Sequence, residues 1–202
     1  NTFAILYVVQ PILPDLTAYY GVTPTAASLS LSVTTFTLAV SMLIFGSISE
    51  AVGRKNIMIA SMLAASVLCI LTAFSPTFSS LIVMRAVQGV ALAGLPSIAM
   101  AYLGEEIHPR SLPGAMGLYI SGNALGAVFG RVFSGVTAGL WGWQYGLIGV
   151  GAVGLFAAFI FWYALSPSKH FVKRDFNVKE LLKSLTGHMK NPLLLILSLI
   201  HI

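Results

Sequence analysis

Long apolar runs separated by short polar stretches make up most of the chain. Three stretches contain no charged residue: Leu29 to Ser49, Ile57 to Met84, and Val132 to Ser168. A helix that crosses a membrane needs about 20 apolar residues, so each stretch is long enough for at least one span. The pattern predicts an all-α integral membrane protein.

Proline, glycine and polar clusters interrupt the runs and mark the ends of the spans. Residues 1–165 are expected to form a six-helix transmembrane half, and a seventh span is expected to start at 192–196. The six expected spans are Thr2 to Ala18, Ala27 to Ser49, Asn56 to Phe74, Ser79 to Leu103, Ala115 to Leu140 and Tyr145 to Leu165.

The composition and the positions of the charges support this interpretation. Hydrophobic residues make up 57% of the chain and charged residues 8%, whereas soluble domains carry about 25% charged residues. Nine of the eleven Lys and Arg residues fall in alternate connections, at 50–56, 104–114 and 166–191. Because Lys and Arg keep short loops in the cytoplasm, we expect these three loops to be cytoplasmic, in a plasma membrane such as the bacterial inner membrane. The net charge of +5 then reflects topology, and the expected partner is the lipid bilayer and not a nucleic acid.

The segment 166–191 differs in character from the spans. Asn177 and Glu180 can form a capping box, and the apolar residues that follow share one helix face. We expect a cytoplasmic linker with a basic amphipathic helix on the membrane surface, leading to a C-terminal half outside this sequence. Residues 197–202 equal one reading frame of a transposon-end adapter used in sequencing libraries, so we expect them to be read-through and the chain to be a fragment.

Three charged residues fall inside expected spans: Asp15, Arg85 and Arg131. A charge at the membrane centre costs about 2.5–3.5 kcal/mol, so each requires an explanation. All three are expected in the outer half of the membrane, where they could form an ion-paired network that carries protons. In the alternative, the arginines extend toward the membrane surface and Asp15 only begins the outer loop.

Glycines recur on one side of the fifth span. Gly122, Gly126 and Gly130 are spaced four residues apart, so they line one helix face and let another helix approach closely. Asn123 is a polar residue on the same span, and Gln88 lies one turn after Arg85 on the fourth. We expect Asn123 and Gln88 to line a substrate cavity.

The sequence contains no recognisable catalytic constellation. It has no His-Glu-x-x-His motif and no paired intramembrane acids, and Cys69 is the single cysteine, so neither a disulfide framework nor a cysteine-based metal site is expected. We therefore expect no enzyme activity, no catalytic residue, no metal and no cofactor.

Three motifs fall on successive spans in a fixed order: GSISEAVGRK (Gly46 to Lys55), LIVMRAVQGVA (Leu81 to Ala91) and GNALGAVFGR (Gly122 to Arg131). With these motifs the chain resembles the N-terminal half of the major facilitator superfamily, in its 12-helix proton-coupled efflux branch. The resemblance implies two six-helix halves around a central cavity, each built of two inverted three-helix repeats. In the third motif Ala127 replaces the usual proline and Arg131 replaces the usual glycine.

The resemblance also implies roles for single residues. Glu50 would bind the positive end of a helix in the other half, and Arg54 would pair with a nearby acid to latch the outward-facing state. Ala51 replaces the usual base between them. Arg85 would take part in proton transfer or tune a neighbouring acid. The expected gating loop consists of Gly46 and Gly53 for close approach, with Glu50, Arg54 and Lys55.

These observations leave three hypotheses for the function. The first is a secondary transporter that exports a small organic molecule or drug, driven by the proton gradient through alternating access. The second is an uptake permease or facilitator for a sugar or organic ion. The third is a non-transporting membrane receptor or scaffold. The insertion cost of the intramembrane charges favours the first two, because a scaffold gains nothing from it.

Overall fold

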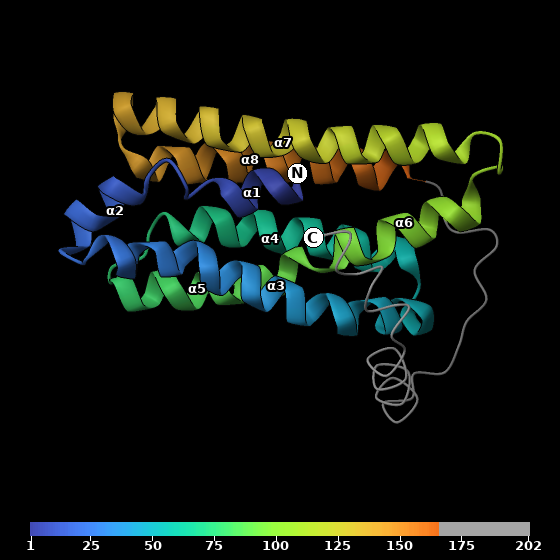
Figure 1. Ribbon diagram of the computed structural model, residues 1–202, viewed down its shortest axis with the longest axis horizontal. Helices are drawn as coiled ribbons and strands as arrows, with labels where there is room; N and C mark the ends of the chain where they lie inside the picture. The colour runs from blue at the N-terminus through green and yellow to red at the C-terminus, as the bar shows by residue number, and fades with distance from the viewer. Residues whose placement is uncertain (166–202) are drawn as a thin grey trace, which may run out of the picture.

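The computed structural model describes residues 1–165, except for the side chains of Ser47, Glu50 and Val52. This part of the chain is entirely helical, and its helices run back and forth along one long axis (Figure 1). The expectations for the linker 166–191, for the seventh span at 192–196 and for 197–202 lie outside the described residues. The helices are α1 (Thr2–Tyr7), α2 (Leu13–Tyr20), α3 (Pro24–Val52), α4 (Arg54–Thr72), α5 (Phe78–Leu92), α6 (Gly94–Glu106), α7 (Leu112–Trp141) and α8 (Trp143–Ala164).

Five segments in the described part are long and apolar enough to cross a membrane. They are Pro24–Gly46, Arg54–Thr72, Phe78–Glu106, Leu112–Trp141 and Trp143–Ala164. These segments correspond to the second to sixth expected spans, which shows that apolar runs and their polar interruptions were sufficient to place them.

The first expected span, Thr2 to Ala18, is not a continuous helix. It divides into α1 and α2, which are separated by five residues. Pro11 has no N–H to donate to the carbonyl of Tyr7, and its ring clashes with a continued helix at that point. The chain instead makes tight turns, in which the N–H of Gln10 donates to the Tyr7 oxygen (3.0 Å). The expected first span therefore consists of two helices with a break before Pro11.

The fourth expected span contains a second irregularity, at Ala93 between α5 and α6. Pro96 cannot donate to the carbonyl of Leu92, which interrupts the helical ladder. Gly94 lies against Ser61 of α4, where a Cβ on the glycine would come within 2.2 Å of the serine Oγ. The bend and the small residue together bring α6 close to α4.

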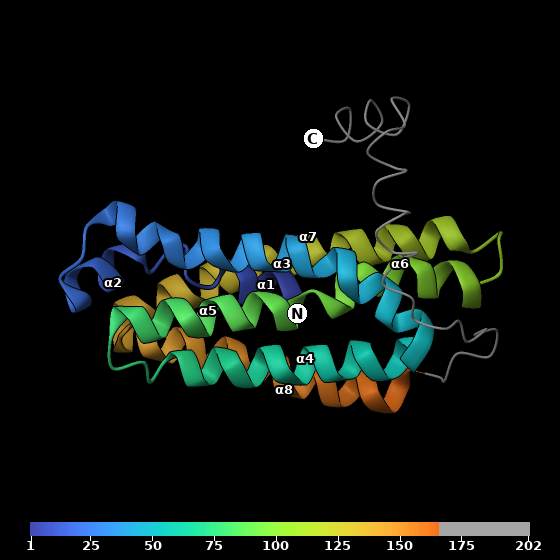
Figure 2. The same cartoon turned by 90° about the horizontal axis from the view of Figure 1, so that it is seen from below.

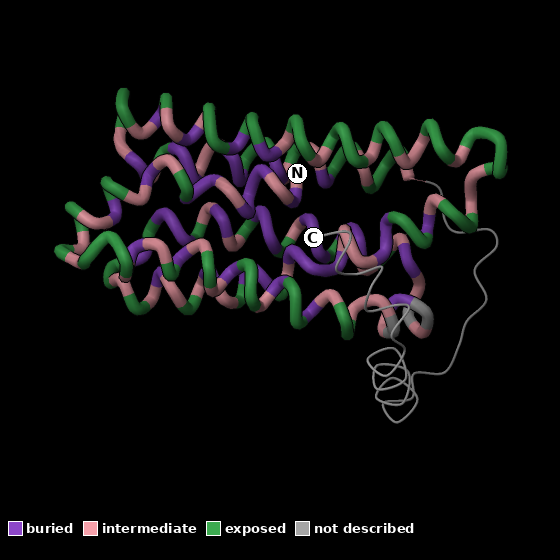
Figure 3. Tube along the Cα trace, viewed as in Figure 1, coloured by how far each residue is buried: buried purple, intermediate pink, exposed green. Residues whose placement is uncertain are grey.

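Small residues allow the helices to pack closely. A Cβ on Gly89 of α5 would lie 2.4 Å from the main-chain oxygen of Thr34 in α3, and one on Gly151 of α8 would lie 3.0 Å from that of Ser66 in α4. Buried residues face the middle of the bundle, and exposed residues cover its outside (Figure 3). Many of these exposed residues are large and apolar, Leu118 and Tyr163 among them, as expected for a surface in contact with lipid.

The two ends of the bundle differ in charge. The α3–α4 turn and the α6–α7 connection lie together at one end, with α2 and the α7–α8 turn at the other (Figures 1 and 2). The first end carries Arg54, Lys55 and Arg110, and we call it the basic end. The expected cytoplasmic loops 50–56 and 104–114 lie at this end.

Candidate functional site

An ion pair at the basic end joins α4 to α6. The guanidinium of Arg54 donates from Nε to Oε2 of Glu105 at 2.6 Å and from Nη2 to Oε1 at 2.5 Å. Such bidentate geometry is the strongest form of arginine–carboxylate contact. The Arg54 side chain is only 9% exposed and that of Glu105 is 36% exposed, so the pair is partly shielded from water.

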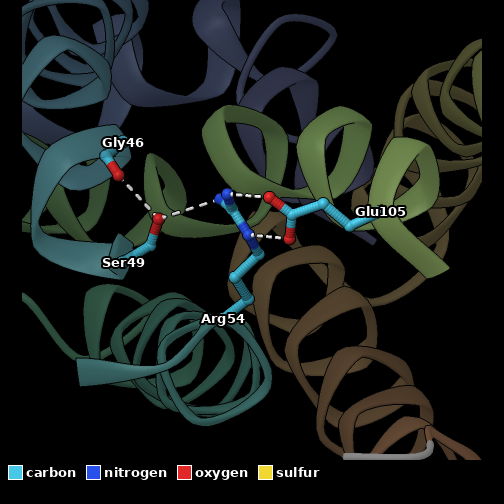
Figure 4. Close-up of polar contacts among 4 residues, drawn as sticks. All are labelled: Gly46, Ser49, Arg54 and Glu105. Carbon is cyan, nitrogen blue, oxygen red and sulfur yellow. Dashed lines mark hydrogen bonds and ion pairs between the residues drawn. The ribbon is translucent and has the colours of Figure 1, made fainter. Parts of the chain in front are cut away.

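A third helix contributes to this pair through Ser49, near the end of α3. Arg54 Nη1 donates to the Ser49 Oγ (3.3 Å), and that hydroxyl donates to the main-chain oxygen of Gly46 (2.6 Å). Figure 4 shows the four residues in one chain of contacts. The network therefore connects the ends of α3, α4 and α6, and we call Ser49, Arg54 and Glu105 the basic-end latch.

Local backbone geometry explains why Arg54 points into the latch. Gly53 separates α3 from α4 with φ 109° and ψ 134°, a conformation open essentially only to glycine. Arg54 is therefore the first residue of α4, where the helix dipole disfavours a positive charge. Glu105 compensates this charge from the neighbouring helix.

Lys55 connects the same end to α8. Its Nζ donates to the main-chain oxygen of Leu165, which caps the C-terminus of α8. A cation at a helix C-terminus is favoured by the helix dipole. Lys55 thus attaches the start of α4 to the end of the sixth span.

The other members of the expected gating loop lie differently from the expectation. Gly46 is not at a close approach within the described residues, since a Cβ there would meet nothing within 4 Å. Gly53 is likewise uncrowded, and it is required for its backbone conformation instead. Glu50 lies near the end of α3, and its side chain is one of those that the structure does not describe.

Arg85 is completely buried in α5 and is surrounded by acceptors. Its guanidinium donates to the main-chain oxygens of Ile5 (3.3 Å), Leu6 (2.9 Å) and Ser30 (3.2 Å), and also to Oε1 of Gln88 (2.5 Å). Ile5 and Leu6 belong to the last turn of α1, whose carbonyls lose their helical partners at the break before Pro11. Arg85 supplies the missing donors.

The expected network of Asp15, Arg85 and Arg131 is not formed. Asp15 is exposed in the first turn of α2, a position that the helix dipole favours for an acid. Among the described side chains no ion pair joins it to either arginine. Arg131 is exposed on α7, with its Cζ 4.4 Å from the centre of the Tyr7 ring. The partners of Arg85 are therefore main-chain oxygens and Gln88, and the partner of Arg131 is the ring of Tyr7; neither arginine pairs with Asp15.

The two expected cavity residues also separate. Gln88 is fully buried, and its Nε2 donates to the main-chain oxygen of Ala65 (3.0 Å) while its Oε1 accepts from Arg85. Both ends of its amide are therefore used inside the bundle, which corrects its assignment to a cavity. Asn123 does line a cavity of about 340 Å³, whose mostly apolar walls come from α4, α6, α7 and α8.

Of the three glycines in the repeat of α7, one makes a close contact with another helix in the described part of the chain. Gly130 is buried against α1, where a Cβ would lie 2.4 Å from the main-chain oxygen of Ala4. At Gly126 the nearest contact would be an ordinary 3.8 Å. Gly122 is exposed with nothing within 4 Å, so it makes no helix contact in the described part of the chain. The expected packing face is therefore shorter than the repeat.

Comparison with known proteins decides the family. The model of the Major Facilitator Superfamily matches residues 2–201. The chain belongs to this family.

Individual relatives agree with this assignment. The chain is 60% identical to an uncharacterized MFS-type transporter, YybF of Bacillus subtilis, over 99% of this chain and 50% of the relative. It is 40% identical to the inner membrane transport protein YnfM of Escherichia coli, over 94% of this chain and 46% of the relative. A more distant match is the purine ribonucleoside efflux pump NepI of E. coli, 26% identical over 75% of this chain and 37% of that protein.

The chain spans about half the length of these relatives, and its fold is the N-terminal half of a Major Facilitator Superfamily protein. It is thus a multi-pass membrane protein of a transporter family, which agrees with the expectation that it is not an enzyme. Among the described residues, no group of three or more His, Cys, Asp or Glu side chains could hold a metal.

Sequence reasoning missed the acid of the latch. Glu105 lies in the stretch LGEEIHPR, in a connection expected on the same side of the membrane as Arg54. That shared side was the available signal. Two adjacent acids, Glu105 and Glu106, made the choice between them impossible without the helix orientation.

Replacing Gly53 with alanine should destabilise the turn that presents Arg54. A Cβ at φ 109° costs about 1–3 kcal/mol, so we expect a lower midpoint of thermal unfolding for the full-length protein in detergent. Gly46→Ala is the matched control, because Gly46 is helical and uncrowded within the described residues. Its midpoint should stay the same or rise. Equal midpoints for Gly53→Ala and wild type would contradict the role given to Gly53.

Proposed function

We propose that the full-length protein is a secondary transporter that exports a small organic molecule or drug in exchange for protons, by alternating access. The observation that carries the proposal is the basic-end latch. Spans one to three and spans four to six are the two three-helix repeats expected for this half. Arg54 and Ser49 belong to the first repeat and Glu105 to the second, so the latch joins the repeats at one end of the bundle.

An alternating-access transporter needs an end that closes firmly and opens again. The latch suits this task because the pair is only half shielded: exposed ion pairs contribute about 0–1 kcal/mol, so water can replace the contact when the end opens. A fully buried pair would resist opening, since removing one partner costs about 3–5 kcal/mol. The names of the distant relatives, an efflux pump and an antiporter, support export and exchange.

A facilitator is the second candidate, and a specific observation favours it. Proton exchange needs a group that gains and loses a proton inside the membrane. In the described part of the chain neither Arg85 nor Arg131 is paired with a carboxylate.

If the protein is proton-coupled and the coupling acid is Asp15, which stands apart from both arginines, Asp15→Asn should abolish gradient-driven transport while leaving exchange flux intact.

Flux in proteoliposomes tests the proposal. The full-length protein would be reconstituted and assayed with radiolabelled inosine, ethidium and benzoate, with and without an imposed pH gradient. We expect the gradient to drive accumulation of at least one of these compounds. Flux at the same rate without the gradient would support the facilitator, and absence of flux for all three would contradict transport of this class of compound.

Variants of the latch connect the geometry to the flux. Arg54→Gln and Glu105→Gln should each slow transport about tenfold, because the basic end no longer closes firmly. The double replacement Arg54→Glu with Glu105→Arg should restore part of the rate. Arg110→Gln is the matched control, since Arg110 is an exposed arginine at the same end outside the latch. Normal flux in both single variants would remove the latch from the mechanism.

A further inference from the structure

Arg131 is an exposed cation deep inside a membrane span. It precedes the last residue of α7, Trp141, by ten residues, which corresponds to about 15 Å along the helix. This depth is about half of the hydrocarbon thickness of roughly 30 Å. The side chain is nevertheless exposed on the surface of the described bundle.

A charge at this depth does not face lipid, because exposure to hydrocarbon is too costly. The neighbours of Arg131 show which surface it occupies. Gly130 is in contact with Ala4, and Tyr7 lies under the guanidinium, so Arg131 stands at the seam between α7 and α1. α1 packs mainly against α7, and in Figure 1 it lies between α7 and α3.

The partner of Arg131 among the described residues is the ring of Tyr7 and not a hydrogen-bond acceptor. The Cζ of Arg131 lies 4.4 Å from the ring centre, within the range of a cation–π interaction. This contact holds the group in place without a hydrogen bond to an oxygen of the described residues. None of the hydrogen bonds of the described residues is donated by its side chain, so the N–H groups remain available for two parallel bonds to an anion.

The charges around Arg131 also favour an anion. The second intramembrane arginine, Arg85, is already surrounded by four acceptors. The remaining acids of residues 1–165 lie at the basic end, apart from Asp15, which is exposed on α2 and not paired with Arg131. The described half therefore presents a positive charge in the membrane that no described carboxylate neutralises.

We infer that Arg131, held by Tyr7, binds the anionic group of the transported substrate, which is a small organic anion such as a carboxylate or phosphate ester. This inference deepens the proposed function and rests on it, because the bound anion is a substrate only if the protein is a transporter. A planar guanidinium recognises both anions through the same bidentate geometry. The assignment also accounts for an arginine at the position where the family motif has glycine.

Equilibrium binding tests this assignment without any flux, so its failure is separate from failure of the transport proposal. Benzoate and phenyl phosphate would be titrated into the purified full-length protein by calorimetry, with benzamide as the neutral analogue of benzoate. We expect saturable binding of at least one anion and at least tenfold weaker binding of benzamide. Equal binding of benzoate and benzamide, or no binding of either anion, would overturn the assignment.

Variants then locate the site. Arg131→Gln should weaken anion binding at least tenfold, and Tyr7→Leu should weaken it less, whereas Tyr7→Phe should retain it because the ring face remains. Arg110→Gln should bind as the wild type does. If Arg131→Gln leaves anion binding unchanged but lowers the thermal unfolding midpoint, Arg131 pairs with an acid of the other half and the assignment is wrong.

Discussion

Replacing Arg85 with methionine is expected to destabilise the first half of the protein more than any other single polar substitution. The change removes the donors for the main-chain oxygens of Ile5 and Leu6 and for Oε1 of Gln88, all of which are buried. A buried acceptor without a donor costs about 1–3 kcal/mol, so three of them together cost at least about 3 kcal/mol. The methionine cannot recover this loss, although it spares the burial of a charge.

The single cysteine of the chain provides the measurement. Cys69 is buried in α4, and it reacts with a thiol-specific dye only when the bundle opens. With any cysteines of the other half replaced by serine, the midpoint of dye labelling on heating reports unfolding around Cys69. A loss of about 3 kcal/mol lowers the midpoint by roughly 6–12 °C in a domain of this size.

Two further variants make the result for Arg85 specific. Val83→Met is the matched control, because Val83 lies two residues away on α5 and is 61% exposed; its midpoint should match that of the wild type. Arg85→Lys retains the charge with fewer donors, so its midpoint should fall between the other two. A midpoint for Arg85→Met within two degrees or so of the wild-type value would show that the α1 carbonyls find other donors.

Replacing Gly89 with valine should separate α3 from α5. A Cβ at this position would lie 2.0 Å from Thr37 Oγ1 and 2.4 Å from the main-chain oxygen of Thr34. The hydroxyl can rotate away, but the main-chain oxygen moves only if the whole helix moves. Overpacking of a core typically costs about 1–3 kcal/mol, and a clash with backbone belongs at the upper end or beyond. The dye-labelling midpoint of Cys69 should fall accordingly.

The control and the rescue variant distinguish a clash from a general effect of valine. Gly139→Val should have little effect, since nothing in the described part lies within 4 Å of a Cβ at Gly139. Adding Thr37→Ala to Gly89→Val should not restore the midpoint, because the Thr34 oxygen remains in place. Full rescue by Thr37→Ala would show that the side chain and not the helix backbone limits the approach.

The sequence was a good guide where a property depends on neighbouring residues. The apolar runs predicted the second to sixth spans, and the alternation of basic loops predicted that Arg54 and Arg110 lie on the same side of the membrane. In the structure both residues lie at one end of the bundle. The sequence was a poor guide at α1, where a run apolar enough for a span contains Pro11. Hydropathy does not register that proline removes a hydrogen-bond donor.

The partners of the charged residues depend on contacts between distant segments. Charge and depth suggested that Asp15, Arg85 and Arg131 belong together, but Arg85 instead donates to oxygens some 80 residues away in the chain. Every residue carries a main-chain oxygen, so no sequence motif identifies the few that a helix break leaves without a partner. Glu105 illustrates the same limit, because only the orientation of α6 selects it over Glu106.

The sequence by itself determined that this chain is a helical membrane protein, where its second to sixth spans lie, and that a Gly-Arg pair occupies the turn after the second span. These properties follow from local hydropathy, local charge and the backbone freedom of single residues. The tertiary structure alone decided that Arg54 pairs with Glu105, that Arg85 completes the broken α1, and that Arg131 rests on Tyr7 without donating a hydrogen bond to any described residue. Each of these contacts exists only because helices distant in the sequence pack closely, and that packing depends on the shape of all the contacting surfaces at once.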